Sequence, residues 1–255
     1  MTSRSWPLGR RPSPAPREVS APAEPPHRPG SSGEHALQCA YGTQDRADRF
    51  YADQVRDRLL PAMVEFVARM EMVFVSTSDA SGECDASLRA GPPGFVAVLD
   101  DRTIAYPEYR GNGVHASLGN IAENPHVGIL MIDFEQDRIG LHVNGVAYIV
   151  ADDDLRAAHP DLPQDTARGR RAERWVVVEV EEAYVHCRKH IPQMQRVTRR
   201  RPWGTDDPGR KGGDYFAARG TPARVPAPPR PRRRFPATTH LGGGSSRTLR
   251  PRRDG

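Results

Sequence analysis

Apolar residues in the middle of the chain predict helices followed by a series of β-strands. Between Asp45 and Met70 they recur mostly every three to five residues, which gives a helix one apolar face that is interrupted at Pro61. From Met72 onward, short segments rich in β-branched and aromatic residues are separated by turn signals. The strands expected on this basis are Met72–Ser78, Cys84–Leu88, Phe95–Leu99, Thr103–Tyr106, Val127–Phe134, Gly140–Val150 and Trp175–Tyr184.

Three of these strands indicate how the sheet is built. Val127–Phe134 is too uniformly apolar to have one face in water, so we expect it to be central, with Gly140–Val150 as its antiparallel neighbour. In the last strand, Val176, Val178 and Val180 face one side. A barrel of roughly six such strands needs about 130 to 150 residues, which the chain provides.

The two ends of the chain differ from this middle part. Residues 1–30 hold 8 of the 25 prolines and residues 221–255 hold 7, so both ends are too polar and Pro-rich to bury a core. Residues 221–255 carry a net charge of +8 and residues 1–44 carry +2, which leaves −5 on residues 45–220 out of a total of +5. We expect residues 1–44 and the Arg/Pro-rich residues 221–255 to be disordered. An alternative interpretation of residues 1–44 is a gene start assigned too far upstream.

Cysteine spacing and hydropathy bear on where the protein works. Cys39, Cys84 and Cys187 are far apart and form no Cys-x-x-Cys pair, which favours a reduced, cytoplasmic protein without a structural zinc site. No apolar run approaches the roughly 20 residues that a membrane helix requires. The arginines near the N-terminus have no apolar segment behind them, so a secretory signal is not expected.

One stretch combines a strand, a glycine turn and a helix. Thr103–Tyr106 leads to Arg110-Gly111-Asn112-Gly113, and a helical segment follows from Ser117. The first turn of a helix has unpaired N–H groups and the positive end of the helix dipole, so this order favours a bound phosphate. Arg110 offers charge, Ser117 offers a hydroxyl, and Asn112 either binds the phosphate or caps the helix.

The motifs along this stretch carry a family resemblance. Arg89-Ala-Gly-Pro-Pro-Gly-Phe-Val96, Tyr109-Arg-Gly-Asn-Gly113, Ser117-Leu-Gly-Asn-Ile121 and His142-Val-Asn-Gly145, in this order, resemble the pyridoxamine 5'-phosphate oxidase-like family of FMN-binding split barrels, also called flavin/deazaflavin oxidoreductases. The resemblance covers about residues 47–191. It implies a mainly β fold with flanking helices, a six-stranded antiparallel split β-barrel over residues 45–192, and a C-terminal segment over the barrel at residues 193–220.

The resemblance also implies a cofactor and a site. FMN would bind at the interface of a homodimer and oxidise or reduce a small-molecule substrate. The guanidinium group of Arg89 would form a bidentate contact with the phosphate. The alternative is an exposed arginine paired with a surface carboxylate. His142 would bond the flavin pyrimidine edge or a substrate charge, and packing is the alternative. The expected cofactor-binding residues are Ser87, Arg89, Tyr106, Arg110, Gly111, Asn112, Ser117 and His142, and Trp175 and Trp203 would cover the flavin ring or serve as core or dimer contacts.

Departures from the family pattern keep other functions open. The vitamin-oxidising members carry a Ser-Arg-Lys-like motif where this chain has Arg110-Gly111-Asn112, and a glutamine and an arginine on the strand that here reads Gly140-Leu-His142. Pyridoxamine phosphate is therefore not the expected substrate. An F420-dependent reductase is one alternative, although its longer acidic cofactor requires a basic groove. A flavin- or haem-binding protein without turnover is another.

Two further features predict no additional cofactor or partner. The histidines His115, His186 and His190 and the nearby Cys187 lack the spacing of a zinc or haem site, so no metal is expected. The cluster Arg230, Arg232, Arg233 and Arg234 would bind nucleic-acid phosphates without sequence preference, but a solvated tail is the simpler interpretation.

Overall fold

The strands form one antiparallel sheet. The computed structural model describes residues 28–164, 169, 171–197, 204–205, 207 and 209–221. Neighbouring strands follow the order β2-β1-β5-β6-β7-β4-β3, and every neighbouring pair is antiparallel. The strands are β1 (Met72–Ser78), β2 (Cys84–Ala90), β3 (Ala97–Asp100), β4 (Thr103–Tyr109), β5 (His126–Asp133), β6 (Ile139–Ala151) and β7 (Ala172–His186).

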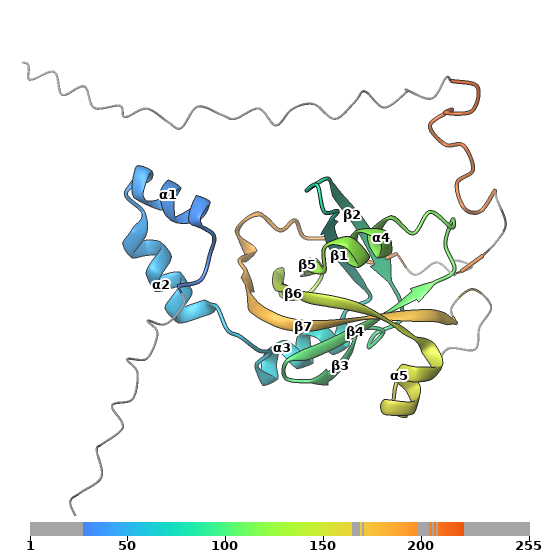
Figure 1. Cartoon of the computed structure of the whole chain (residues 1–255), viewed down its shortest axis with the longest axis horizontal. Coiled ribbons are helices and arrows are strands. Elements are labelled where there is room, and N and C mark those ends of the chain that lie inside the picture. The colour runs from blue at the N-terminus through green and yellow to red at the C-terminus, as the bar shows by residue number, and fades with distance from the viewer. Residues whose placement is uncertain are drawn as a thin grey trace, which may run out of the picture. The chain divides into compact units, whose positions relative to one another are not determined.

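This architecture confirms the predicted fold class, with differences in detail (Figure 1). The described residues form seven strands, each overlapping one of the seven segments predicted as strands, whereas the expected barrel has six. The edge strands there are β2 and β3, and no ladder joins them, so hydrogen bonds do not close the sheet. As predicted, β5 lies inside the sheet and β6 is its antiparallel neighbour, with Met131 opposite Leu141.

Alternation along β7 separates two clusters of buried side chains. Val176, Val178 and Val180 lie in the main core, as their spacing predicts. Trp175 and Val177 point to the other side and pack with Leu155. Fully burying a side chain of this kind contributes about 1.5 to 3 kcal/mol, so β7 stabilises the fold from both faces.

Five α-helices and one short 3₁₀ helix (Arg188–His190) accompany the sheet in the described residues. The helix predicted between Asp45 and Met70 is present as two helices, and the second begins at Pro61, a residue that suits the first position of a helix. No helix here has both the length and the apolar character needed to cross a bilayer. The α-helices are α1 (Ser32–Tyr41), α2 (Gln44–Gln54), α3 (Pro61–Arg69), α4 (Ala116–Glu123) and α5 (Asp152–Ala158).

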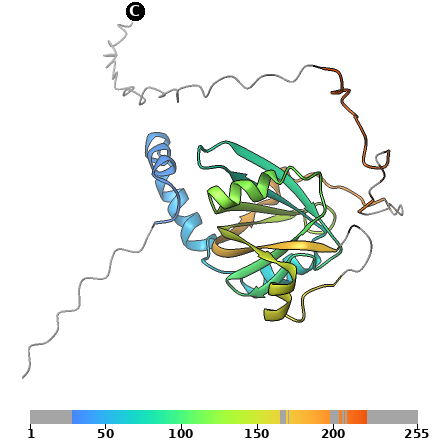
Figure 2. The same cartoon turned by 45° about the vertical axis from the view of Figure 1, so that its right-hand side comes forward.

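The prediction of disorder up to residue 44 is wrong for Ser32–Tyr41, which form α1. The Ser31 hydroxyl accepts a hydrogen bond from the Glu34 N–H at the start of this helix, and Gly42 ends it in a left-handed conformation. Gln38 also bonds the hydroxyl of Tyr51 on α2. The Pro-rich composition of residues 1–30 hid these local helix signals. Figures 1 and 2 show α1 and α2 (blue) to one side of the barrel.

The chain divides into two compact units, Met1–Asp206 and Asp207–Gly255. Near the end of the first, the Met194 N–H bonds the Phe134 carbonyl and Arg196 pairs with Glu71, so the segment after the barrel is attached to it there. The described part of the second unit consists of turns, such as the one in which the Asp214 carboxylate accepts from backbone N–H groups. The predicted Arg230–Arg234 cluster lies outside the described residues.

Candidate functional site

A cavity of about 440 Å³ opens between β2, the end of β4 and the start of α4. We call it the turn cavity, because the glycine turn at residues 111–115 forms one of its walls. Five of the eight predicted cofactor-binding residues line it, namely Ser87, Arg89, Gly111, Asn112 and Ser117. Asp85, Glu108 and His115 line it too, so the cavity brings together β2 and the stretch from the end of β4 to the start of α4.

Strand β2 supplies one wall of this cavity through its alternation. Asp85, Ser87 and Arg89 are half-buried, whereas Cys84 and Leu88 are exposed. A period of two places Asp85, Ser87 and Arg89 on the same face of the strand. The functional groups predicted along Asp85–Arg89 therefore face a common space.

The glycine turn enters α4 through two left-handed residues. Gly113 has φ 82° and His115, the N-cap residue, has φ 56°. The side-chain oxygen of Asn112 accepts a hydrogen bond of 3.0 Å from the Val114 N–H, so Asn112 closes this turn and does not cap the helix. Ala116, Ser117 and Leu118 then bring the positive end of α4 to the cavity.

Arg89 forms an ion pair inside the cavity. Its Nε donates to Oε1 of Glu108 at 2.7 Å, and the two side chains are only 19% and 14% exposed. The alternative of an arginine paired with a carboxylate is thus realised, but the pair is largely buried and lines the cavity rather than the open surface. Glu108 is a residue that sequence reasoning missed.

Two serines and an aspartate form a hydrogen-bonded chain in the same cavity. The Ser117 hydroxyl donates to Oδ2 of Asp85 at 3.0 Å, and the Ser87 and Ser117 hydroxyl oxygens are 3.1 Å apart. Ser117 is buried, as is expected of a polar group with partners. The structure therefore joins the two predicted residues Ser87 and Ser117 directly, and it adds Asp85, which had no predicted role, as the acceptor for Ser117.

Tyr106 does not line the turn cavity but lies in the core. Its side chain is fully buried, and within the described residues its hydroxyl has no hydrogen-bond partner. Burial raises the pKa of Tyr106, and the charge of Glu108 raises it further. The hydroxyl is thus a neutral group in the core, and the nearby charges of Glu108 and Arg89 act on its pKa in opposite directions.

Arg110 and His142 also lie away from the turn cavity. Arg110 lines another cavity, of about 470 Å³, together with Asp152 and Glu173. On β6, His142 hydrogen-bonds His186 between Nε2 and Nδ1 at 2.9 Å, and its ring stacks on Tyr184 with 4.6 Å between centroids. Burial, together with the neighbouring His186, lowers the pKa of His142.

The predicted aromatic cover of the flavin ring finds no support in the described residues. Trp175 is buried in the second core cluster, and its Nε1 donates to the Asp152 carboxylate at 2.7 Å, so it serves as a core contact. Trp203 lies outside the described residues. In the part of the chain that the structure describes, no group of three or more His, Cys, Asp or Glu side chains is arranged to hold a metal ion.

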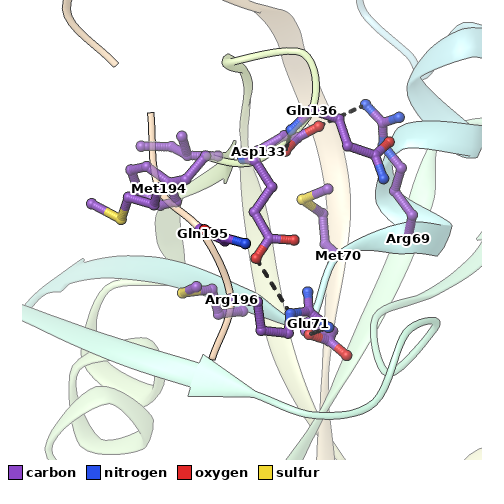
Figure 3. Close-up of a pocket in the computed structure, with 12 residues that line it drawn as sticks. Arg69, Met70, Glu71, Asp133, Gln136, Met194, Gln195 and Arg196 are labelled. Carbon is purple, nitrogen blue, oxygen red and sulfur yellow. Dashed lines mark hydrogen bonds and ion pairs between the residues drawn. The ribbon is translucent and has the colours of Figure 1, made fainter. Parts of the chain in front are cut away.

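A further cavity, of about 310 Å³, lies where β1 begins and β5 ends (Figure 3). Arg69 pairs there with Asp133 at 3.3 Å, and Arg196 pairs with Glu71 at 2.7 Å and with Glu135 at 3.4 Å. None of the predicted site residues lines this cavity. Arg196 comes from the segment that follows the barrel, so the ion pairs of this cavity attach that segment to the barrel.

Comparisons with known proteins place the matching region over the barrel. A family model described as Pyridoxamine 5'-phosphate oxidase matches residues 59–187, slightly more than half of the 255 residues. A comparison with curated proteins finds no match.

Several solved structures resemble the chain over about half its length. HupZ of Group A Streptococcus is 16% identical, with 54% of this chain and 100% of that chain covered and a TM-score of 0.37. HutZ, the heme storage protein of Vibrio cholerae, is 18% identical, with 51% and 94% covered and a TM-score of 0.33. An F420 reductase is 19% identical, with 48% and 94% covered and a TM-score of 0.32.

Proposed function

Because the chain belongs to the pyridoxamine 5'-phosphate oxidase family, we propose that it binds FMN and transfers hydride or electrons to or from a small molecule. The turn cavity carries this proposal. There Arg89, a glycine turn and the first residues of α4 face a common space of about 440 Å³. An arginine beside a helix N-terminus suits the phosphate end of FMN, because both favour an anion.

The donors around the cavity fit a single phosphate. The first hydrogen bond within α4 runs from the Gly119 N–H to the His115 carbonyl, so the N–H groups of Ala116, Ser117 and Leu118 precede it and remain available. Arg89 adds a charged donor, although Glu108 balances its charge. Because Asp85 and Glu108 outnumber Arg89 in this cavity, the several acidic groups of F420 would be repelled more strongly than the single phosphate of FMN.

FMN would supply the redox chemistry at its own ring. The protein would bind the phosphate through Arg89 and the start of α4, orient the remainder of the cofactor, and limit access of water. A dedicated acid or base is not required by such a reaction. This agrees with a cavity whose carboxylates, Asp85 and Glu108, are both engaged in hydrogen bonds.

The proposal includes a homodimer with the cofactor at its interface. On the face of the sheet that points away from the core, Leu88 lies opposite Phe74, and Phe74 lies opposite Leu130. Met72, Phe74 and Leu88 are 39%, 41% and 54% exposed. We call these three residues and Leu130 the outer sheet face. Adjacent exposed apolar side chains favour a protein interface. Leu88 also lines the turn cavity, so a second copy bound here would complete the site.

Replacing Arg89 tests the phosphate contact. We expect Arg89→Ala to weaken FMN binding about tenfold to a hundredfold, since hydrogen bonds to charged groups contribute about 1.5 to 3 kcal/mol. Calorimetric titration with FMN measures the effect. Arg102→Ala is the control, because Arg102 forms an exposed ion pair with Asp57 and lines none of these cavities.

Part of that loss could come from Glu108, which Arg89→Ala leaves without its partner. The double variant Arg89→Ala/Glu108→Ala removes both charges and so separates the two effects. If Arg89 binds phosphate, the double variant stays weaker than wild type. Wild-type affinity in Arg89→Ala, or full recovery in the double variant, would remove Arg89 from the phosphate site.

A further inference from the structure

The hydrogen-bonded chain of Ser87, Ser117 and Asp85 has a direction. An ionised carboxylate can only accept, so the single hydroxyl hydrogen of Ser117 is committed to Asp85 Oδ2, at 3.0 Å. Ser117 therefore has no hydrogen left for Ser87, whose oxygen is 3.1 Å away. The hydrogen between the two serines must come from Ser87.

This direction decides what Ser87 can offer to a ligand. Ser117 is only 3% exposed, whereas Ser87 is half-buried and lines the turn cavity. With its hydrogen directed at Ser117, the Ser87 oxygen presents only lone pairs to the cavity. A fully ionised phosphate also has only acceptors, and it would in addition face the negative charge of Asp85.

We propose that Ser87 accepts a hydrogen bond from a neutral donor of the cofactor and does not contact its phosphate, an inference that rests on the proposed binding of FMN. FMN has two kinds of neutral donor, the ribityl hydroxyls and the ring N3–H. The phosphate then lies at Arg89 and the start of α4. Ser87 and Arg89 are two residues apart on one face of β2, roughly 7 Å along a strand, so one extended cofactor reaches both.

Asp85 is a positioning residue in this scheme, because it acts on the ligand through the two hydroxyls. Its carboxylate fixes the hydrogen of Ser117, which fixes that of Ser87. Removing the acceptor would let a hydroxyl hydrogen turn toward the cavity. Ser87 could then donate to a phosphate, which it cannot do in the wild-type protein.

Ser87→Ala, titrated with a series of flavins, tests the assignment. We expect FMN and riboflavin to bind about threefold to tenfold more weakly, as for a neutral hydrogen bond. Competition by inorganic phosphate should be unchanged. Lumiflavin, which keeps the N3–H but lacks the ribityl chain, identifies the donor: unchanged affinity assigns a ribityl hydroxyl, and weakened affinity assigns the ring N–H.

Other results overturn the inference and separate it from the proposed function. Weaker FMN and phosphate binding with unchanged riboflavin would place the phosphate at Ser87, and unchanged binding of all the flavins would remove Ser87 from the site. In both cases FMN binding itself would stand. A wild-type protein that binds none of the three flavins would instead overturn the proposed function, and this inference with it.

The direction of the chain is tested by two substitutions of Asp85. Asp85→Asn removes the charge but keeps an oxygen that can accept from Ser117, whereas Asp85→Ala removes the acceptor as well. We expect the ratio of FMN to riboflavin affinity to rise severalfold more in Asp85→Ala than in Asp85→Asn. Equal ratios in the two variants would show that charge alone matters and would contradict the proposed direction.

Discussion

Arg89 and Glu108 illustrate what a single residue reveals in the sequence and what it conceals. Arg89 could be identified because it precedes Gly91-Pro-Pro-Gly94 within a family motif. Glu108 could not be matched to it, because β2 and β4 are not neighbours in the sheet and only its curvature brings them together. The same reasoning missed Asp85, whose role depends on a contact with Ser117, 32 residues away.

His142 should make stability depend on pH in a defined direction. Its pKa is lowered in the folded protein, first by burial and then by His186, so the unfolded chain binds its proton more readily. Stability is therefore expected to fall as pH decreases below about 6.5, the ordinary pKa of histidine. The slope from this group is at most about 1.4 kcal/mol per pH unit, and it is smaller here because His142 is only half-buried.

Urea unfolding of His142→Gln across this pH range measures that contribution. The variant should lose part of the acid-side decrease in the free energy of unfolding. His126→Gln is the matched control, because His126 is an exposed histidine on the neighbouring strand β5. An acid-side slope equal to that of wild type in His142→Gln would contradict the assignment.

The helix α4 was predicted almost to its ends because its signals are local. The glycine turn precedes it and Pro125 follows it, and the observed helix is Ala116–Glu123. The start of β3 was predicted less accurately. Phe95 and Val96 are apolar enough for the predicted strand but lie before it, in a loop where the Phe95 N–H bonds the Pro92 carbonyl. Their burial comes from tertiary packing, which periodicity does not register.

The pairing of β6 with β7 depends on a glycine. The register shifts between Asn144 and Gly145, and a side chain at Gly145 would collide with the backbone carbonyl of Glu179. We expect Gly145→Ala to lower the free energy of unfolding by more than about 2 kcal/mol, because backbone must move to relieve the contact.

Gly128→Ala provides a control for this effect. Gly128 is also a strand glycine, but its added methyl group would come no closer than 3.4 Å, to the side-chain oxygen of Asn144. Chemical denaturation of both variants should show a much larger loss for Gly145→Ala. Similar stabilities would mean that the β6–β7 contact is less constrained than its geometry indicates.

The outer sheet face allows the assembly of the whole protein to be tested. If a second copy covers this face, Phe74→Asp and Leu88→Asp should shift the protein from dimer to monomer in sedimentation velocity, because a charge would be buried at the interface. Both should also weaken FMN binding. Leu37→Asp on α1 is a matched control, since Leu37 and Leu88 are each 54% exposed. A monomeric wild type would contradict the proposed dimer.

For the chain as a whole, composition and motifs gave the fold class and the position of the barrel. They could not show that β2 and β3 are the edge strands, because the local sequence of an edge strand resembles that of an inner strand. Nor could they separate Arg110 from the turn cavity, since adjacent positions such as Arg110 and Gly111 can face different cavities. The net positive charge of the chain comes from residues 1–44 and 221–255, which carry +2 and +8, whereas residues 45–220 carry −5.

The most direct test of FMN binding is the visible absorption spectrum of the full-length protein after incubation with FMN and removal of unbound cofactor. We predict a retained flavin spectrum, with about one FMN per chain, as expected if each turn cavity holds one phosphate. A protein that stays colourless, or that retains haem but no flavin, would contradict the account.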